Sequence, residues 1–191
     1  MLNTDAERAV SMGQRSPRTG SGTRKQVSQR QRIGSQLVGM GLVRQEQLDK
    51  ALSAQLQFRG RLGSNLVELG ALKVDDLARA LGRQHGVGAA TRADFLEIDP
   101  QLAKRLPARA ANMYNAIPIR AVPGHRNAVV VAMMDPHNLL AIDELGAILG
   151  ARVQALVAPE LRIVHLLERI YGVKRKHRTF IRVVLDQPLE S

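Results

Sequence analysis

The chain has 191 residues, room for one or two domains, and its 45% share of hydrophobic residues excludes a disordered chain. Aromatics are only 3%, which argues against binding through many stacked rings, and the absence of Cys excludes disulfides, thiolate metal sites and cysteine nucleophiles. The net charge of +11 suggests a polyanion ligand, but residues 1–31 hold +4 of it and residues 173–191 hold +3, so only +4 remains between them.

The two ends are predicted to be basic tails. Residues 1–29 are mostly Ser, Gly, Thr, Gln and Arg, which have little to bury, and we expect them to be disordered. A second basic tail is expected at 173–191. No segment approaches the roughly 18 apolar residues that span a bilayer, and the first residues lack the apolar stretch of a signal peptide. We therefore expect a cytoplasmic protein without a membrane span.

After the first tail the chain repeats itself with a period of 29 residues. The first copy, RIGSQLVGMGLVRQEQLDKALSAQ, runs from Arg32 to Gln55, and the second, RLGSNLVELGALKVDDLARALGRQ, runs from Arg61 to Gln84. The five residues LQFRG join them. Duplication of a motif this long indicates two copies of one structural unit.

Each copy has the spacing of two short helices, because its apolar residues recur at steps of three and four. Gly41 and Gly70 lie where the first helix of each copy should end in a left-handed cap. One such helical pair is too short to be stable alone. We expect the two pairs to pack their apolar faces together.

Beyond the repeats the pattern becomes mixed. IDPQLAKRL predicts a helix with Pro100 in its first turn, and the β-branched runs Ala116–Val122 and Ala128–Met133 predict strands. DPHNLLAIDELGAILG and PELRIVHLLERIYG predict helices on either side of a third strand, VQALVA. The expected fold is therefore α+β: a tandem helical-hairpin subdomain at 30–90 packed on a small three-stranded α/β subdomain at 91–172.

The sequence offers little support for catalysis. It contains no GxxxxGK[ST], HExxH or GxSxG motif, and its five His residues are scattered. The acidic pairs at 75–76 and 143–144 are expected on helix faces or in first turns. We predict that the protein is not an enzyme.

The repeated start, Arg-x-Gly-Ser, suggests binding instead. An Arg at the beginning of a helix is electrostatically misplaced unless an anion accompanies it. A guanidinium fork beside bare helix N–H groups and a Gly suits a phosphate or the acceptor edge of guanine, and the Gln that closes each copy can bond a base edge. Two identical motifs favour a ligand with two identical halves. The alternative is a duplicated helical hairpin whose Arg and Gln are solvated.

The pattern R-L-G-x-x-[LVI]-[LVI]-x-x-G-[LVI]-[LVI]-x4-L-x3-L-x2-Q, present twice with a five-residue spacer, resembles the MshEN domain, the N-terminal cyclic di-GMP-binding domain of type II secretion and type IV pilus assembly ATPases. Ile33 and Ala71 depart mildly from it. The similarity continues to about residue 172. An ATPase core follows this domain in the family, so the resemblance implies a free-standing receptor module without the motor.

The resemblance also implies binding residues. Arg32 and Arg61 would engage guanine and phosphate groups, with backbone access at Gly34 and Gly63. Six apolar residues would form the surface on which the ligand lies, namely Ile33, Leu37, Leu52, Leu62, Leu66 and Leu81. Gln55 and Gln84 would bond base edges or phosphate. Arg30 and Asp135 are candidates from outside the motifs.

We therefore expect a non-enzymatic receptor that binds cyclic di-GMP, uses no cofactor or metal, and signals to a protein partner in a secretion, pilus or motility pathway. One alternative is a docking module of such a system that works without nucleotide. Another is nucleic-acid binding through the Arg-rich tails and the helical pairs, which would weaken steeply with salt. This last alternative ranks lowest because no helix clusters Arg, Asn and Gln as a recognition helix does.

Overall fold

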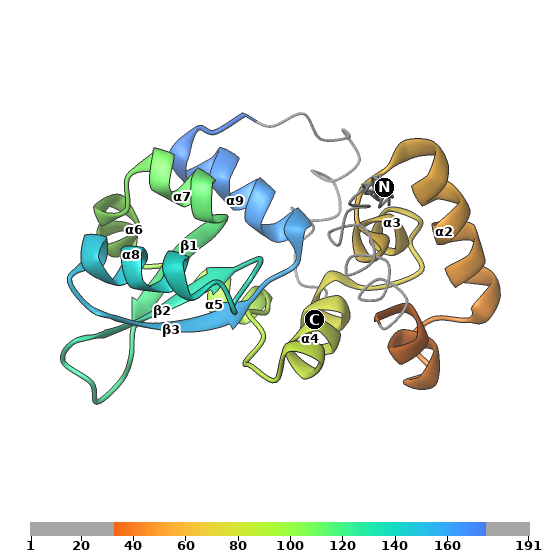
Figure 1. Ribbon diagram of the computed structural model, residues 1–191, viewed down its shortest axis with the longest axis horizontal. Coiled ribbons are helices and arrows are strands. Elements are labelled where there is room, and N and C mark those ends of the chain that lie inside the picture. Colours follow the sequence, from red (N-terminus) through yellow and green to blue (C-terminus); the bar gives the residue numbers. More distant parts are fainter. Residues whose placement is uncertain (1–32, 175–191) are drawn as a thin grey trace, which may run out of the picture.

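The computed structural model describes residues 33–174; Arg30, Arg32, the tail at 1–29 and nearly all of the tail at 173–191 lie outside it. Helices of the two repeats form one group, and a three-stranded sheet with its covering helices forms the other (Figure 1). After a first helix at 33–39, the elements are α2 (Gln45–Phe58), α3 (Leu62–Glu68), α4 (Val74–His85), α5 (Arg92–Leu96), α6 (Pro100–Arg105), α7 (Ala108–Tyr114), β1 (Ala116–Ala121), β2 (Ala128–Met133), α8 (Leu139–Leu149), β3 (Arg152–Val157) and α9 (Glu160–Tyr171).

The two repeats form the two helical pairs that their spacing predicts. The first helix of each pair ends at a glycine in the left-handed region, with φ of 68° at Gly41 and 67° at Gly70. The same hydrogen bond closes each end: Leu42 N donates to Leu37 O at 3.0 Å, and Ala71 N donates to Leu66 O at 2.9 Å. The predicted glycine caps are thus confirmed.

A second glycine in each copy lets the helices of the pair approach closely. A Cβ placed on Gly34 would lie 3.0 Å from Leu48 Cδ1, and one placed on Gly63 would lie 2.7 Å from Leu77 Cδ1. These two contacts occupy equivalent positions of the repeat. The glycine that follows each motif Arg therefore serves helix packing, and a side chain at either position would meet a leucine of the neighbouring helix.

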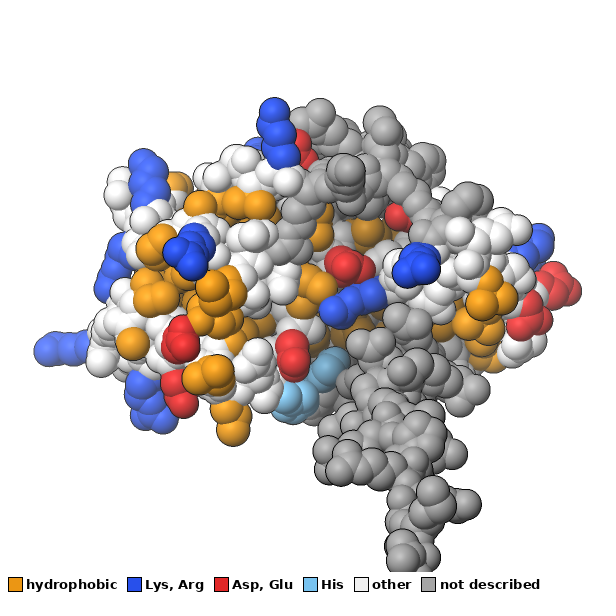
Figure 2. All heavy atoms as spheres, turned by 45° about the horizontal axis from the view of Figure 1, so that its top comes forward, with side chains coloured by type: hydrophobic (Ala, Val, Ile, Leu, Met, Phe, Trp, Pro, Cys, Tyr) orange, Lys and Arg blue, Asp and Glu red, His pale blue; other side chains and the backbone are white. Residues whose placement is uncertain are grey.

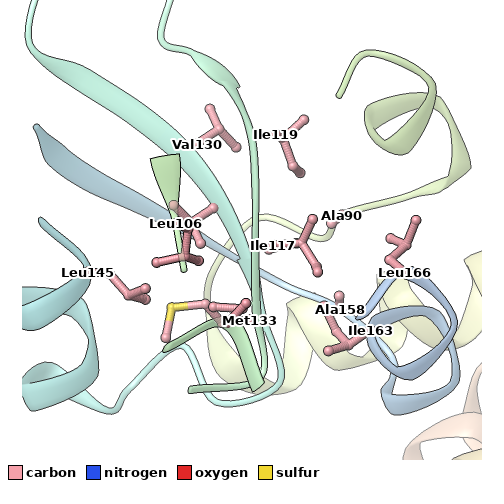
Figure 3. Close-up of a cluster of buried hydrophobic side chains, with 14 of the residues drawn as sticks. Ala90, Leu106, Ile117, Ile119, Val130, Met133, Leu145, Ala158, Ile163 and Leu166 are labelled. Atoms are coloured by element: carbon pink, nitrogen blue, oxygen red, sulfur yellow. The ribbon is translucent and has the colours of Figure 1, made fainter. Parts of the chain in front are cut away.

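The apolar side chains form two core clusters. The helical cluster contains residues of both copies, including the fully buried Leu37 and Leu66, together with Leu161 of α9. The sheet cluster is built from the strands and from α6, α7, α8 and α9, and Figure 3 shows part of it around Ile117, Met133 and Leu145. The two helical pairs pack their apolar faces together, as predicted.

The sheet has the order β1-β2-β3. β1 pairs antiparallel with β2, and the register shifts between Pro118 and Arg120, where proline lacks an N–H donor. β2 pairs in parallel with β3 after the α8 crossover, with Ala128 opposite Arg152 and Met133 opposite Val157. One hairpin and one crossover, covered by helices, make the expected small α/β part of an α+β fold.

The connection after α4 joins the helical pairs to the sheet. Val157 N donates to Gly88 O and Ala90 N donates to Val157 O, both at 2.9 Å, so residues 88–90 run parallel to the end of β3. A Cβ on Gly88 would lie 2.6 Å from Leu156 Cδ2, so a larger residue there would require the Leu156 side chain to move. The connection therefore holds α4 beside the sheet.

Two short helices were not expected from the sequence. α5 is held by a local bond in which Thr91 N donates to Asp94 Oδ2 at 2.9 Å, and it buries none of its residues. α7 begins directly after Pro107 and ends at Asn115, whose φ is 49°. Because α5 buries no residue and α7 buries only Ala111, neither shows an apolar helical period. The helix expected at IDPQLAKRL is present as α6, with Asp99 as its cap.

Candidate functional site

A cavity of about 350 Å³ lies between the two core clusters. Its walls come from residue 33, the start of α3 with the preceding Arg61, and α4 in the helical group, and from the segments that follow β2 and β3 and the first residue of α9 in the sheet group. This volume falls within the roughly 300–1,000 Å³ of small-molecule sites. Acidic, basic and histidine side chains gather in the middle of the surface in Figure 2.

Seven of the residues expected at the binding site line this cavity. Five belong to the second motif, one to the first, and one lies outside both. They are Arg61, Leu62, Gly63, Leu81, Gln84, Ile33 and Asp135.

The other expected residues within the described range lie elsewhere. Leu37 and Leu66 have no exposed surface and pack in the helical cluster, and Gly34 is buried against Leu48. Leu52 is 40% exposed, and Gln55 Nε2 donates to Gly60 O at 2.6 Å. None of these five lines the cavity.

Among the described residues that line the cavity, Arg61 alone carries a guanidinium. It is the N-cap residue of α3, with extended backbone, and its side chain is 57% exposed. Its Nε lies 3.7 Å from Glu160 Oε2, and Ser64 Oγ donates to the same carboxylate oxygen at 3.2 Å. Because α3 has only seven residues, the guanidinium and not the helix dipole is the main positive charge there.

A pair of histidines lies beside these charges. The rings of His85, the last residue of α4, and His137, in the loop after β2, have centroids 5.2 Å apart. Burial lowers the pKa of His85, the charges of His137 and Arg61 lower it further, and Asp135 opposes them. The neutral imidazole is therefore favoured, and it can both donate and accept a hydrogen bond at the cavity wall.

A part-buried ion pair joins the two groups of elements. Arg162 of α9 is 8% exposed, and its Nη2 donates to Asp75 Oδ1 of α4 at 3.2 Å. The same oxygen accepts from Arg92 N at 3.0 Å, and the guanidinium of Arg162 lies 5.6 Å from the ring centre of Phe95. Burial lowers the pKa of Arg162, while the Asp75 carboxylate opposes this shift and keeps the charge paired.

Several wall residues were not foreseen from the sequence. Leu77 belongs to the apolar stripe of the second copy, and His85 directly follows the motif, so both lay close to a visible signal. Met134, Pro159 and Glu160 have no local signature, because they reach the cavity through the fold of the sheet group. Ser64 belongs to the Arg-x-Gly-Ser start of the second motif but was not among the expected binding residues.

The structure is a small α+β module whose cavity has one guanidinium, two carboxylates and an apolar floor in the described wall. Among residues 33–174, no group of three or more His, Asp or Glu is placed to hold a metal ion. None of the helices described in that range is long and apolar enough to cross a membrane.

Comparison with known proteins identifies the module. Residues 85–177 match the family model of the MshEN domain, so the chain carries an MshEN domain. The matched range begins where the tandem motifs end, so it covers the sheet group and does not include the repeats.

The chain is also similar to individual proteins. The type IV pilus assembly ATPase PilB of Myxococcus xanthus (strain DK1622) is 35% identical over 144 residues, which are 75% of this chain but only 25% of PilB. A solved structure of MshE with cdg has 29% identity and a TM-score of 0.50, covering 73% of this chain and 98% of that chain. The N-terminal domain of XpsE is 19% identical, with a TM-score of 0.49, over 83% of this chain and 98% of that chain.

Proposed function

We propose that this chain is a non-enzymatic receptor for cyclic di-GMP and that the cavity between the two core clusters is its binding site. The observation that carries the proposal is convergence: residues from the start and the end of the second motif line one cavity, namely Arg61, Leu62, Gly63, Leu81 and Gln84. The similarity to MshE, whose solved structure contains cdg, which we take to be cyclic di-GMP, supports this ligand.

The wall residues match the chemistry of a guanine nucleotide. The Arg61 guanidinium can donate two parallel hydrogen bonds to guanine O6 and N7 or to a phosphate. Asp135 is exposed at the cavity and can accept from the N1–H and N2–H donors of guanine, which adenine does not present in that arrangement. Leu62, Leu77 and Leu81 supply apolar surface for a base or ribose.

Cyclic di-GMP has two identical halves, and the first copy of the repeat would hold the second half. Ile33 already lies in the cavity wall, at the repeat position that Leu62 occupies in the second copy. We propose that Arg32 and Gln55 act as the counterparts of Arg61 and Gln84. Arg30 and Leu52 would complete this half, while Gly34, Leu37 and Leu66 keep the helices packed beneath the ligand.

Calorimetric titration with cyclic di-GMP, GTP and cyclic di-AMP tests this function. We expect binding of cyclic di-GMP with clear preference over the other two, because the proposed site needs a ligand with two guanine halves. GTP has only one half, and cyclic di-AMP has no guanine. The absence of heat with cyclic di-GMP, or equal affinity for all three nucleotides, would overturn the proposal.

Substitution of Arg61 tests the site. Arg61→Ala should weaken binding roughly 10- to 100-fold, since a bidentate contact contributes about 1–3 kcal/mol. Arg79→Ala is the matched control, because Arg79 is equally exposed on α4, pairs with Asp76 and does not line the cavity. Equal losses in the two variants would show that only net charge matters.

Signalling to a protein partner is the second part of the proposal, and docking without nucleotide is its alternative. Leu139 and Leu140 at the start of α8 are 71% and 68% exposed, and Figure 2 shows hydrophobic side chains across the sheet half of the surface. Exposed apolar patches mark protein interfaces. Capture of a pilus or secretion protein that changes with cyclic di-GMP supports signalling, and capture unaffected by nucleotide and by Arg61→Ala supports the alternative.

A further inference from the structure

The Glu160 carboxylate contacts Arg61, the guanidinium that we assign to the ligand, and the neighbouring Ser64. Glu160 Oε2 accepts from Ser64 Oγ at 3.2 Å and lies 3.7 Å from Arg61 Nε, and all three residues line the cavity. A hydroxyl and a guanidinium converging on one oxygen form the kind of donor set that a phosphate also uses. Glu160 thus makes contacts of the kind that an anionic ligand would make with these two side chains.

Glu160 and a phosphodiester cannot share Arg61 without a cost. Both are anions, and the repulsion between two like charges about 4 Å apart weakens the binding affinity about fivefold even in water. The Glu160 side chain is 33% exposed, so it can turn toward solvent when another anion arrives. Ligand binding then requires the Arg61–Glu160 contact to open.

We propose that Glu160 is an internal competitor of the ligand: it holds Arg61 and Ser64 in the empty receptor, lowers the affinity for cyclic di-GMP, and releases the start of α9 from α3 when the ligand binds. This inference rests on the proposed function, because it concerns the same cavity and the same nucleotide.

The position of Glu160 couples this release to the rest of the fold. Its neighbour Leu161 packs in the helical cluster and is 4% exposed, whereas Ile163, Leu166 and Leu167 of the same helix pack in the sheet cluster. The first turn of α9 is therefore shared between the two clusters. A ligand that takes Arg61 from Glu160 removes one of the contacts that hold this turn against α3.

If Glu160 instead bound the ligand directly, neutralising it would change the affinity in the opposite direction. If its carboxylate accepted hydrogen bonds from guanine, as we propose for Asp135, then neutralising it would weaken binding. If it competes with phosphate, then neutralising it tightens binding. The sign of one affinity change therefore separates the two roles.

The test is calorimetric titration of the full chain and of Glu160→Gln with cyclic di-GMP. Glutamine keeps the length of the side chain and can still accept from Ser64, and a part-exposed residue at a helix start tolerates it. We expect Glu160→Gln to bind about fivefold more tightly, the factor for removing one nearby like charge. Thermal unfolding of both proteins without ligand confirms that the variant is folded.

Glu97→Gln is the matched control, because it makes the same charge change in an ion pair with Arg120 and does not line the cavity. Its affinity should stay within about twofold of the unchanged protein, as expected for distant surface charges in salt. Equal tightening in both variants, or unchanged or weaker binding in Glu160→Gln, would overturn the competition. If the unchanged protein does not bind cyclic di-GMP, the proposed function fails and the competition falls with it.

Discussion

The glycine after each motif Arg allows a graded prediction about stability. In Gly63→Ala the new methyl would lie 2.7 and 2.9 Å from the two terminal carbons of Leu77, which is itself buried. Overpacking of this kind lowers the free energy of unfolding by about 1–3 kcal/mol, whereas replacing glycine by alanine in a helix raises it by about 1 kcal/mol. We expect a net loss of about 1 kcal/mol in the free energy of unfolding.

Two other glycines supply matched comparisons. Gly34→Ala places its methyl 3.0 Å from Leu48, so the gain and the cost should nearly cancel. A Cβ at Gly39, in the same first helix, meets nothing within 4 Å, so Gly39→Ala should gain about 0.5–1 kcal/mol. The expected order of stability is therefore Gly39→Ala, then Gly34→Ala, then Gly63→Ala.

Urea unfolding followed by far-ultraviolet circular dichroism measures this order, since the chain has no Trp for fluorescence. A double-variant cycle identifies the contact: Leu77→Ala alone should cost about 2–5 kcal/mol, and about 1 kcal/mol less when Gly63 is already alanine. A Gly63→Ala protein as stable as Gly39→Ala would refute the packing role of this glycine.

Two further predictions concern titratable groups. Because the folded-state pKa of His85 lies below its ordinary value, near 6.5, the unfolded chain takes up a proton that the native chain resists; stability should therefore fall as the pH drops below about 6.5. His85→Gln should flatten this fall in urea midpoints measured from pH 8 to 5, and an unchanged slope would contradict the assignment. Asp75→Ala should cost about 2 kcal/mol, less than the roughly 3–5 kcal/mol for a fully buried pair because Asp75 is 31% exposed. Adding Arg162→Leu should recover part of this loss in urea midpoints, and purely additive losses would argue against the pair.

The elements with strong local signals were predictable from the sequence. The period of 29 residues and the glycine caps led to the two helical pairs, and the β-branched run Ala128–Met133 has the same bounds as β2. The short helices α5 and α7 were missed, because α5 buries none of its residues and α7 buries only Ala111, so neither shows an apolar period. Local pattern was therefore sufficient where an element is long or repeated.

The cavity was only partly predictable. The second motif led to Arg61 and Gln84, since both lie within one repeat unit. Glu160 was not foreseen because it reaches Arg61 only through the return of α9, a contact that no spacing in the sequence encodes. Leu37 and Leu66 carry the apolar pattern of the motif, but apolarity does not distinguish a side chain in the core from one at the cavity wall.

The wall of the cavity joins residues from nearly opposite ends of the described range, with Ile33 at one end and Glu160 at the other. Contacts between sequence neighbours close short loops at a small entropic cost, whereas α9 must close a long one to reach α3. The helical pairs can therefore form early in folding, while the binding site needs nearly the whole domain. A ligand that recognises this site stabilises only chains that have finished folding, so by mass action it also protects the completed domain from unfolding.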